Sequence, residues 1–197
     1  MLYPVRNAEF DKEKVLRAAM VAFMGKGYSK TSMQDLTKAT GLHPGSIYCA
    51  FENKRGLLLA ALEQYQKDRN TEFNRIFTKD KSFLVALREY LGNVLAECIS
   101  CDVAKACLLT KALSEISEQD DELQSLISEN LNQWQQSLTE QFEKGKLASE
   151  LKSTRDSAHL ARFFVMGIYG LRTFAQTHPD KAVLSQLADQ LYQDILV

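Results

Sequence analysis

The chain has 197 residues and a formal net charge of −1, and 45% of its residues are hydrophobic. Three prolines and nine glycines leave little room for the many turns of an all-β protein, whereas Leu, Ala, Gln, Glu and Lys, which dominate, favour helices. A chain of this length can bury a sizeable core in one or two domains. We expect a cytoplasmic protein without membrane association, because no run of about eighteen apolar residues and no signal-peptide core is evident.

Charge is unevenly distributed along the sequence. Residues 1–55 contain nine Lys and Arg against five acidic residues, a balance of +4, which leaves −5 for the remainder. A basic N-terminal part joined to an acidic remainder is typical of a nucleic-acid-binding module attached to a module of another kind. A near-neutral total does not exclude DNA binding, because only one face has to be basic.

The first predicted helix begins after Asp11, a residue type that caps helix N-termini. The segment before it is interpreted either as a frayed terminus or as a short arm whose Arg6 touches DNA. Two glycines end the helix at residues 25–27. Its expected inner stripe consists of Val15, Ala19, Ala22 and Phe23.

The segment from Thr31 to Leu58 has the layout of a helix-turn-helix, in which a second short helix is presented to the major groove of DNA. Thr31 is predicted to cap the first short helix, and Gln34 to complete a capping box. Gly41 then supplies the backbone freedom that a helix C-terminus needs.

The second short helix is predicted to begin at Pro44, where a missing N–H costs little, with His43 as a weak cap. Ile47 and Phe51 are four residues apart, so we expect both to point inward. The outward side chains of this segment are then His43, Ser46, Tyr48 and Cys49.

A long helix is predicted from Asn53 to about Thr78, with Lys54 and Arg55 in its first turn. A helix N-terminus prefers negative charge, because its unpaired N–H groups carry the positive end of the dipole. Two cations there indicate either a solvated surface pair or a nearby phosphate, and the helix-turn-helix pattern favours the phosphate. Such a helix can join two modules rigidly.

These motifs resemble the DNA-binding segment of TetR-family transcriptional regulators. The matching residues are Thr40-Gly41 before the turn, Tyr48-Cys49-Ala50-Phe51 in the recognition helix, and Lys54 after it. Family members often carry an aromatic residue or His between the Tyr and the Phe, where this chain has Cys49 and Ala50. The resemblance therefore predicts the scaffold but not which bases are contacted.

The resemblance implies an all-α fold of about nine helices in total. Residues 1–54 would form an N-terminal three-helix helix-turn-helix domain, and residues 55–197 a C-terminal helical effector-binding and dimerisation domain. Apolar periodicity places the later helices at about 83–98, 103–113, 120–144, 156–177 and 180–196.

The predicted helix at 156–177 contains two glycines in a strongly apolar stretch. Glycine in a helix interior costs about 1 kcal/mol relative to alanine, so close approach of another helix is the natural compensation. The resemblance implies that the last two helices pair with those of a second subunit; packing within one chain is the alternative. The expected dimer interface comprises Phe164, Gly167, Ile168, Gly170 and Leu171.

Three cysteines, Cys98, Cys101 and Cys107, lie close together. A single CxxC does not supply four zinc ligands, so we expect no metal site and no cofactor. Cys107 and its neighbours resemble the Gly-Cys-Leu segment of NemR-like family members, some of which sense electrophiles or oxidants. Nearby Lys105 and Lys111 would favour the thiolate form of Cys107. Cys98 or Cys101 would then resolve an oxidised Cys107 by forming a disulfide with it. The alternative is that Cys107 is a small buried packing residue.

The other predicted signal is an unknown small molecule in an apolar cavity of the second module. Tyr90, Trp134 and Phe163 are our main candidates for its lining, although each also suits an ordinary core. Further candidates by composition are Phe83, Leu87 and Met166.

The sequence thus predicts a homodimeric, ligand- or redox-responsive repressor and not an enzyme. Its two recognition helices would occupy successive major grooves of a palindromic operator in double-stranded DNA, about 34 Å apart. A thiol oxidoreductase or metal-binding enzyme using the cysteine cluster is the alternative, and an activator remains open. Expected phosphate contacts are Thr31, Ser32, Tyr48 and Lys54, and expected base-facing residues are His43, Pro44 and Ser46.

Overall fold

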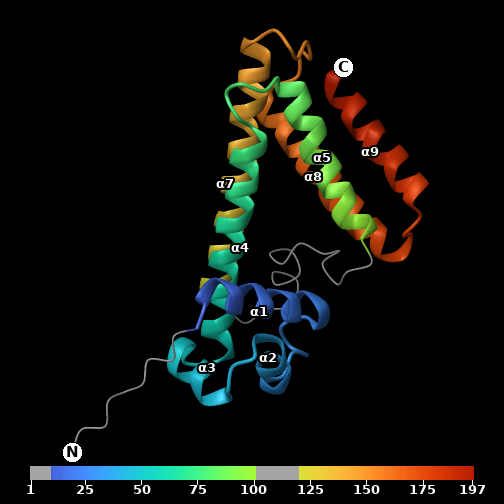
Figure 1. Ribbon diagram of the computed structural model, residues 1–197. Helices are drawn as coiled ribbons and strands as arrows, with labels where there is room; N and C mark the ends of the chain where they lie inside the picture. The colour runs from blue at the N-terminus through green and yellow to red at the C-terminus, as the bar shows by residue number, and fades with distance from the viewer. Residues whose placement is uncertain (1–9, 101–119) are drawn as a thin grey trace, which may run out of the picture.

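The computed structural model describes residues 10–100 and 120–197, and these residues form an all-α structure. The expected helix at 103–113 and the arm at 1–9 lie outside the described residues. Among the helices of the described ranges, none is long and apolar enough to cross a membrane. Figure 1 labels α1 (Lys12–Lys26), α2 (Met33–Thr40), α3 (Pro44–Phe51), α4 (Lys54–Ile76), α5 (Phe83–Ile99), α7 (Asp121–Leu147), α8 (Ser157–Thr177) and α9 (Lys181–Leu196).

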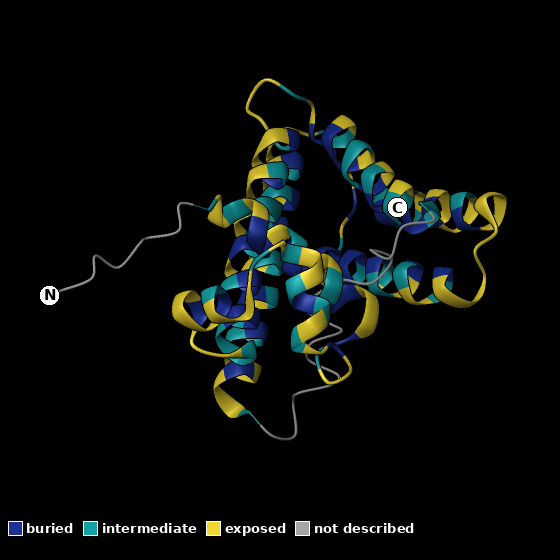
Figure 2. Ribbon diagram, turned by 60° about the horizontal axis from the view of Figure 1, so that its bottom comes forward, coloured by how far each residue is buried: buried dark blue, intermediate teal, exposed yellow. Residues whose placement is uncertain are grey.

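Helix α4 connects two groups of helices. Figure 1 shows α1, α2 and α3 gathered around its N-terminal end, and α5, α8 and α9 at the other end of the molecule. Helix α7 begins near the first group and ends in the second. Figure 2 shows buried residues on the sides of the helices that face one another and exposed residues on the outer sides.

Most helix termini lie where their capping residues predict them. Asp11 Oδ1 accepts a hydrogen bond from the Lys14 amide at 3.1 Å at the start of α1. Asn53 Oδ1 accepts one from the Gly56 amide at 2.9 Å at the start of α4. Gly41 ends α2 in the left-handed conformation, with φ of 71°, which glycine adopts without strain.

The predicted cap of α2 is wrong. Ser32, not Thr31, is the capping residue, and Asp35, not Gln34, completes the capping box. Thr31 is only 1% exposed, and its hydroxyl donates a 2.5 Å hydrogen bond to the carbonyl of Gly27. The threonine hydroxyl therefore fastens the turn between α1 and α2 and does not face solvent.

The first hydrophobic core extends beyond the three N-terminal helices. Phe23, Leu36, Ile47 and Phe51 from α1, α2 and α3 belong to one buried cluster, and three of them, Phe23, Ile47 and Phe51, were predicted to point inward. The same cluster continues along α4 and reaches two residues of α7, and its further members include Leu57, Leu58, Ala61, Leu62, Tyr65, Leu123 and Ile127. The first half of α4 is therefore part of the N-terminal core.

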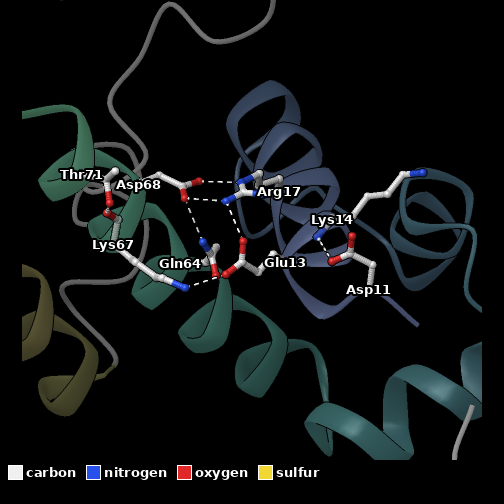
Figure 3. A network of polar contacts seen from close by, with 8 residues as sticks. All are labelled: Asp11, Glu13, Lys14, Arg17, Gln64, Lys67, Asp68 and Thr71. Carbon is white, nitrogen blue, oxygen red and sulfur yellow. Dashed lines mark hydrogen bonds and ion pairs between the residues drawn. The ribbon is translucent and has the colours of Figure 1, made fainter. Parts of the chain in front are cut away.

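A network of polar contacts also joins α1 to α4 (Figure 3). Arg17 donates two hydrogen bonds of 2.8 Å to the carboxylate of Asp68, and Lys67 donates one of 2.5 Å to Glu13. Gln64 donates to the same Asp68 carboxylate. Exposed ion pairs contribute little stability singly, but a bidentate pair restricts geometry, so this network fixes how α1 lies on α4.

The predicted dimer residues of α8 are largely core residues of their own chain. Phe164 is 0% exposed, and Ile168 and Leu171 are also buried, so the prediction is wrong for these three. Gly167 faces α9 of the same chain, where an added Cβ would lie 2.5 Å from Leu191 Cδ1. Close packing of α8 on α9 within one chain therefore compensates for the cost of placing Gly167 inside a helix. Gly170 is exposed, with nothing within 4 Å of an added Cβ.

Replacing Gly167 by Ala tests the close contact between α8 and α9. We expect Gly167→Ala to lower the free energy of unfolding by about 1–3 kcal/mol, because Leu191 has to repack in a filled core. Gly92→Ala in α5 is the control, since an added Cβ there meets nothing within 4 Å. Because alanine favours a helix interior over glycine, this control should raise the free energy of unfolding by up to about 1 kcal/mol. Urea denaturation measures both, and equal effects would contradict the assigned contact.

Candidate nucleic-acid interface and ligand cavity

Helix α3 presents its outer face to solvent because its inner face is anchored. Ile47 and Phe51 are buried in the first core, one turn apart. His43 accepts a hydrogen bond from the Gly45 amide at 3.3 Å, and Pro44 occupies the first turn. Both predictions for the start of this helix are thus confirmed.

The predicted base-facing residues lie together at the N-terminal end of α3. His43 and Pro44 are exposed, and Ser46 is partly buried. Tyr48, one turn further on, is 49% exposed. The residues that the resemblance left undefined, Cys49 and Ala50, are also exposed. Figure 1 places this helix at the end of the molecule farthest from α9.

The predicted phosphate contacts divide into surface and interior residues. Thr31 is buried, so its side chain is not placed to reach a phosphate, and the prediction is wrong for this residue. Ser32 is exposed, but its hydroxyl donates a 2.7 Å hydrogen bond to Asp35. Lys26 lies 2.5 Å from the same carboxylate, and hydrogen bonds from Lys26 and Ser32 hold the pKa of Asp35 below its ordinary value.

Lys54 and Arg55, expected to act alike, have different partners. The Lys54 ammonium lies 4.4 Å from the centroid of the Tyr28 ring and donates to the Ser29 carbonyl at 3.5 Å, which holds it beside the turn before α2. Arg55 instead lies against the start of α7. Its guanidinium donates to Asp120 at 2.5 and 2.9 Å and to Glu122 at 2.7 Å.

Arg55 therefore joins the N-terminal helices to α7. The prediction that Arg55, like Lys54, contacts a phosphate is wrong. Asp120 is also the N-cap of α7 and accepts a hydrogen bond from the Leu123 amide at 3.0 Å. The hydrogen bonds from Arg55 and then from Leu123 lower the pKa of Asp120 to about 2. The acidic start of α7 was visible in the sequence, but no local pattern pairs it with a cation 65 residues away.

The cysteine candidates do not form a site in the described part of the chain. Cys98 is buried in the second core, and Cys49 is exposed on α3. Cys101 and Cys107 lie outside the described residues. Among residues 10–100 and 120–197, no group of three or more His, Cys, Asp or Glu could hold a metal ion.

A small cavity of about 40 Å³ lies between α4, α5, α7 and α8. Two predicted effector residues, Tyr90 and Trp134, line it together. Phe163 does not, and lies instead beneath the guanidinium of Arg155 at 5.9 Å. Met166 is 61% exposed. The remaining lining residues, which sequence reasoning missed, are Tyr65, Gln66, Arg69, Asn70, Leu131, Ile168, Tyr169 and Arg172.

Two arginines of the cavity share one carboxylate. Arg69 on α4 donates to Glu97 Oε1 at 2.6 Å, and Arg172 on α8 donates to Glu97 Oε2 at 2.7 Å. Burial raises the pKa of Tyr90, so its hydroxyl stays neutral. A signal for Arg172 existed, because a charged residue inside the apolar stretch of α8 needs a partner.

Two family models match this chain. Residues 15–61 match the model described as bacterial regulatory proteins, tetR family, and residues 84–191 match the one described as tetracyclin repressor-like, C-terminal domain. The first range contains α2, α3 and most of their supporting helix α1, and the second contains α7, α8 and most of α5 and α9.

Relatives and solved structures agree with these matches. The chain is 27% identical over 185 residues to the HTH-type transcriptional repressor ComR of Escherichia coli (strain K12), covering 93% of this chain and 88% of ComR. It is similar in fold to a cysteine mutant of the TetR family transcriptional regulator CifR complexed with 26bp double-strand operator DNA (24% identity, TM-score 0.82, 95% and 98% covered). Reduced E. coli NemR is also similar in fold (16% identity, TM-score 0.83, 94% and 96% covered).

The pairing of Asp120 with Arg55 predicts a pH-dependent contribution to stability. Because the folded-state pKa of Asp120 lies below its ordinary value of 3.8, the ionised carboxylate stabilises the fold above about pH 4, and this contribution is lost as the pH falls toward about 2. Asp120→Asn keeps a capping side chain but removes the charge. We expect wild type to be more stable than Asp120→Asn at neutral pH, with the difference shrinking on acidification.

Urea denaturation followed by circular dichroism across that pH range measures the difference. Arg55→Gln is the matched background, in which Asp120→Asn should have a much smaller effect on the free energy of unfolding. A difference that does not change with pH, or that persists fully without Arg55, would contradict the assigned ion pair.

Proposed function

This chain belongs to the TetR family of bacterial regulatory proteins, and on this premise we propose that it is a homodimeric repressor that an effector releases from a palindromic operator. Membership makes it a DNA-binding transcriptional regulator. The observation that carries the proposal is the exposed outer face of α3, mounted on buried Ile47 and Phe51 at one end of the molecule. ComR, a relative of similar length, is named a repressor.

The arrangement of α3 supports contact with base edges by His43, Pro44 and Ser46. In helix-turn-helix proteins the N-terminal residues of the recognition helix approach the bases, and these three lie at that end of α3. With Thr31 excluded by its burial, the proposed phosphate contacts are Ser32, Tyr48 and Lys54. The ring of Tyr28 and the carbonyl of Ser29 hold the Lys54 side chain close to the segment that precedes α2.

A second copy of the chain is the proposed partner in the dimer. One chain offers one recognition helix, whereas a palindromic site requires two, about 34 Å apart. Helices α8 and α9 pack against each other, and both expose large apolar side chains, namely Met166 of α8 and Val183 and Leu187 of α9. These outward residues support an interface on the outer sides of α8 and α9, in place of the buried residues first predicted.

The position of the cavity supports control by a small molecule. Arg69 lines the cavity from α4, and the same helix carries Lys54 at its other end beside the helix-turn-helix. An effector would act by binding more tightly to a conformation in which the two recognition helices have the wrong separation. An electrophile or oxidant acting on Cys107 is the alternative signal, and that residue lies outside the described ranges.

We also propose that the chain has no enzymatic role. The thiol oxidoreductase hypothesis needs an accessible cysteine cluster, whereas the described member of that cluster, Cys98, is buried. The presence of α4 residues in both hydrophobic cores supports a regulator, because a displacement of such a helix in one core is felt in the other.

Replacing Lys54 tests the DNA-contact model. We expect Lys54→Gln to weaken binding to operator and non-operator DNA alike, because a phosphate contact carries no sequence information. The slope of log Kd against log salt should fall by about 0.9 for each lost contact, or about 1.8 for a dimer. Fluorescence anisotropy of labelled duplexes at several salt concentrations measures both quantities.

Two further variants sharpen this test. Lys152→Gln removes an exposed lysine in the loop between α7 and α8 and should leave the salt slope unchanged. His43→Ala should reduce the preference for operator over other DNA without changing the slope. Wild-type affinity and slope in Lys54→Gln would show that the proposed docking is wrong.

A further inference from the structure

The cavity between α4, α5, α7 and α8 has cations in its wall. Arg69 and Arg172 line it, whereas the carboxylates that pair with them, Glu97 and Glu72, do not line it and line a neighbouring space instead. Arg172 is only 12% exposed. The charge nearest to the cavity is therefore positive, although the four side chains together are neutral.

The carboxylates that pair with the arginines do not accept hydrogen bonds from every buried N–H group in the cavity wall. Arg69 lies 2.6 Å from one oxygen of Glu97 and 3.3 Å from one oxygen of Glu72, whereas a guanidinium is best matched by two parallel hydrogen bonds to one carboxylate. Arg69 Nε is buried and has no hydrogen-bond partner within residues 10–100 and 120–197. The buried indole Nε1 of Trp134 has no acceptor in strict hydrogen-bonding geometry within the same residues, and the group that interacts with it is the Tyr90 hydroxyl.

Buried donors of this kind indicate a missing acceptor. Leaving a buried N–H without a partner costs about 1–3 kcal/mol, and more when the group is charged. Both donors belong to residues that line the same cavity, one on α4 and one on α7. A ligand that carries two acceptor oxygens and a negative charge would satisfy both donors and face the arginines.

The rest of the lining favours an apolar body on that ligand. Leu131 and Ile168 supply aliphatic surface, and the rings of Trp134 and Tyr169, whose centroids are 5.9 Å apart, supply aromatic surface. A cavity of about 40 Å³ suits a molecule of a few heavy atoms. Neutral Tyr90 offers a further hydroxyl.

We propose that this cavity binds a small organic carboxylate with a short apolar body, held by Arg69, Arg172 and Trp134. The inference rests on the proposed function, because it names the chemical class of the effector. The bound carboxylate would compete with Glu97 for the two arginines. Arg69 lies on α4, so a change in its partners acts directly on the helix that supports the helix-turn-helix.

The single tryptophan of the chain provides the measurement, because Trp134 lies in the cavity wall. The purified full-length protein, without DNA, is titrated with propionate and with butyrate, and separately with the neutral amide of each acid. We expect a saturable change in tryptophan fluorescence with at least one acid, bound at least about tenfold more tightly than its amide. Equal binding of acid and amide, or no saturable change with any acid, would overturn the proposal.

Variants then locate the binding site by calorimetry. Arg172→Gln should reduce the affinity for the acid to that for the amide. If Arg172→Gln does not fold, Trp134→Phe keeps an aromatic ring, removes the N–H donor, and should weaken binding of the acid by about tenfold. Phe163→Leu, outside the cavity, is the control and should bind like wild type. Unchanged binding of the acid by the cavity variants would contradict the assignment.

These titrations contain no DNA, so their outcome is separate from that of operator binding. A protein that binds carboxylates but no DNA would contradict the proposed function and leave this ligand class standing. A protein that binds operator DNA but no carboxylate would overturn the proposed ligand class and leave the proposed DNA binding standing.

Discussion

Helix α4 takes part in both hydrophobic cores, and this constraint determines how the two groups of helices are related. Its first half buries Leu57, Leu58 and Ala61 against α1, α2 and α3, whereas Phe73 near its end packs in the core of α5, α7, α8 and α9. Because protein interiors are closely packed, a displacement of such a helix in one core is felt in the other. The outer face of α3 and the cavity are therefore connected by one continuous element.

Electrostatic contacts reinforce this connection at both ends of the first core. Arg17 and Glu13 fasten α1 to the middle of α4. Arg55 at the start of α4 binds Asp120 and Glu122 at the start of α7, so the positive charge meets the acidic N-terminus of another helix. Two cations adjacent in sequence thus have separate roles, one next to α2 and the other holding α7 against the N-terminal helices.

The sequence was sufficient to predict the helices of residues 10–100 and 120–197 and most of their caps, because periodicity and capping are local properties. Ile47 and Phe51 were correctly placed inside for the same reason. The burial of Thr31, the pairing of Arg55 with Asp120 and the inward direction of Phe164 depend on neighbours distant in sequence, which periodicity does not identify. The cavity was half predicted: Tyr90 and Trp134 were expected by composition, but Arg69 and Arg172 line it only because four helices converge.

The most direct measurement of the central claim is selection of DNA fragments by the purified full-length chain, followed by footprinting of the selected site. We expect two symmetric protected half-sites whose centres lie one helical turn apart, about 10 base pairs, or a multiple of it. Protection should disappear when His43 and Tyr48 on the exposed face of α3 are both replaced by Ala. Failure to select any DNA, or an unchanged footprint from that double variant, would contradict the claim that α3 binds operator DNA.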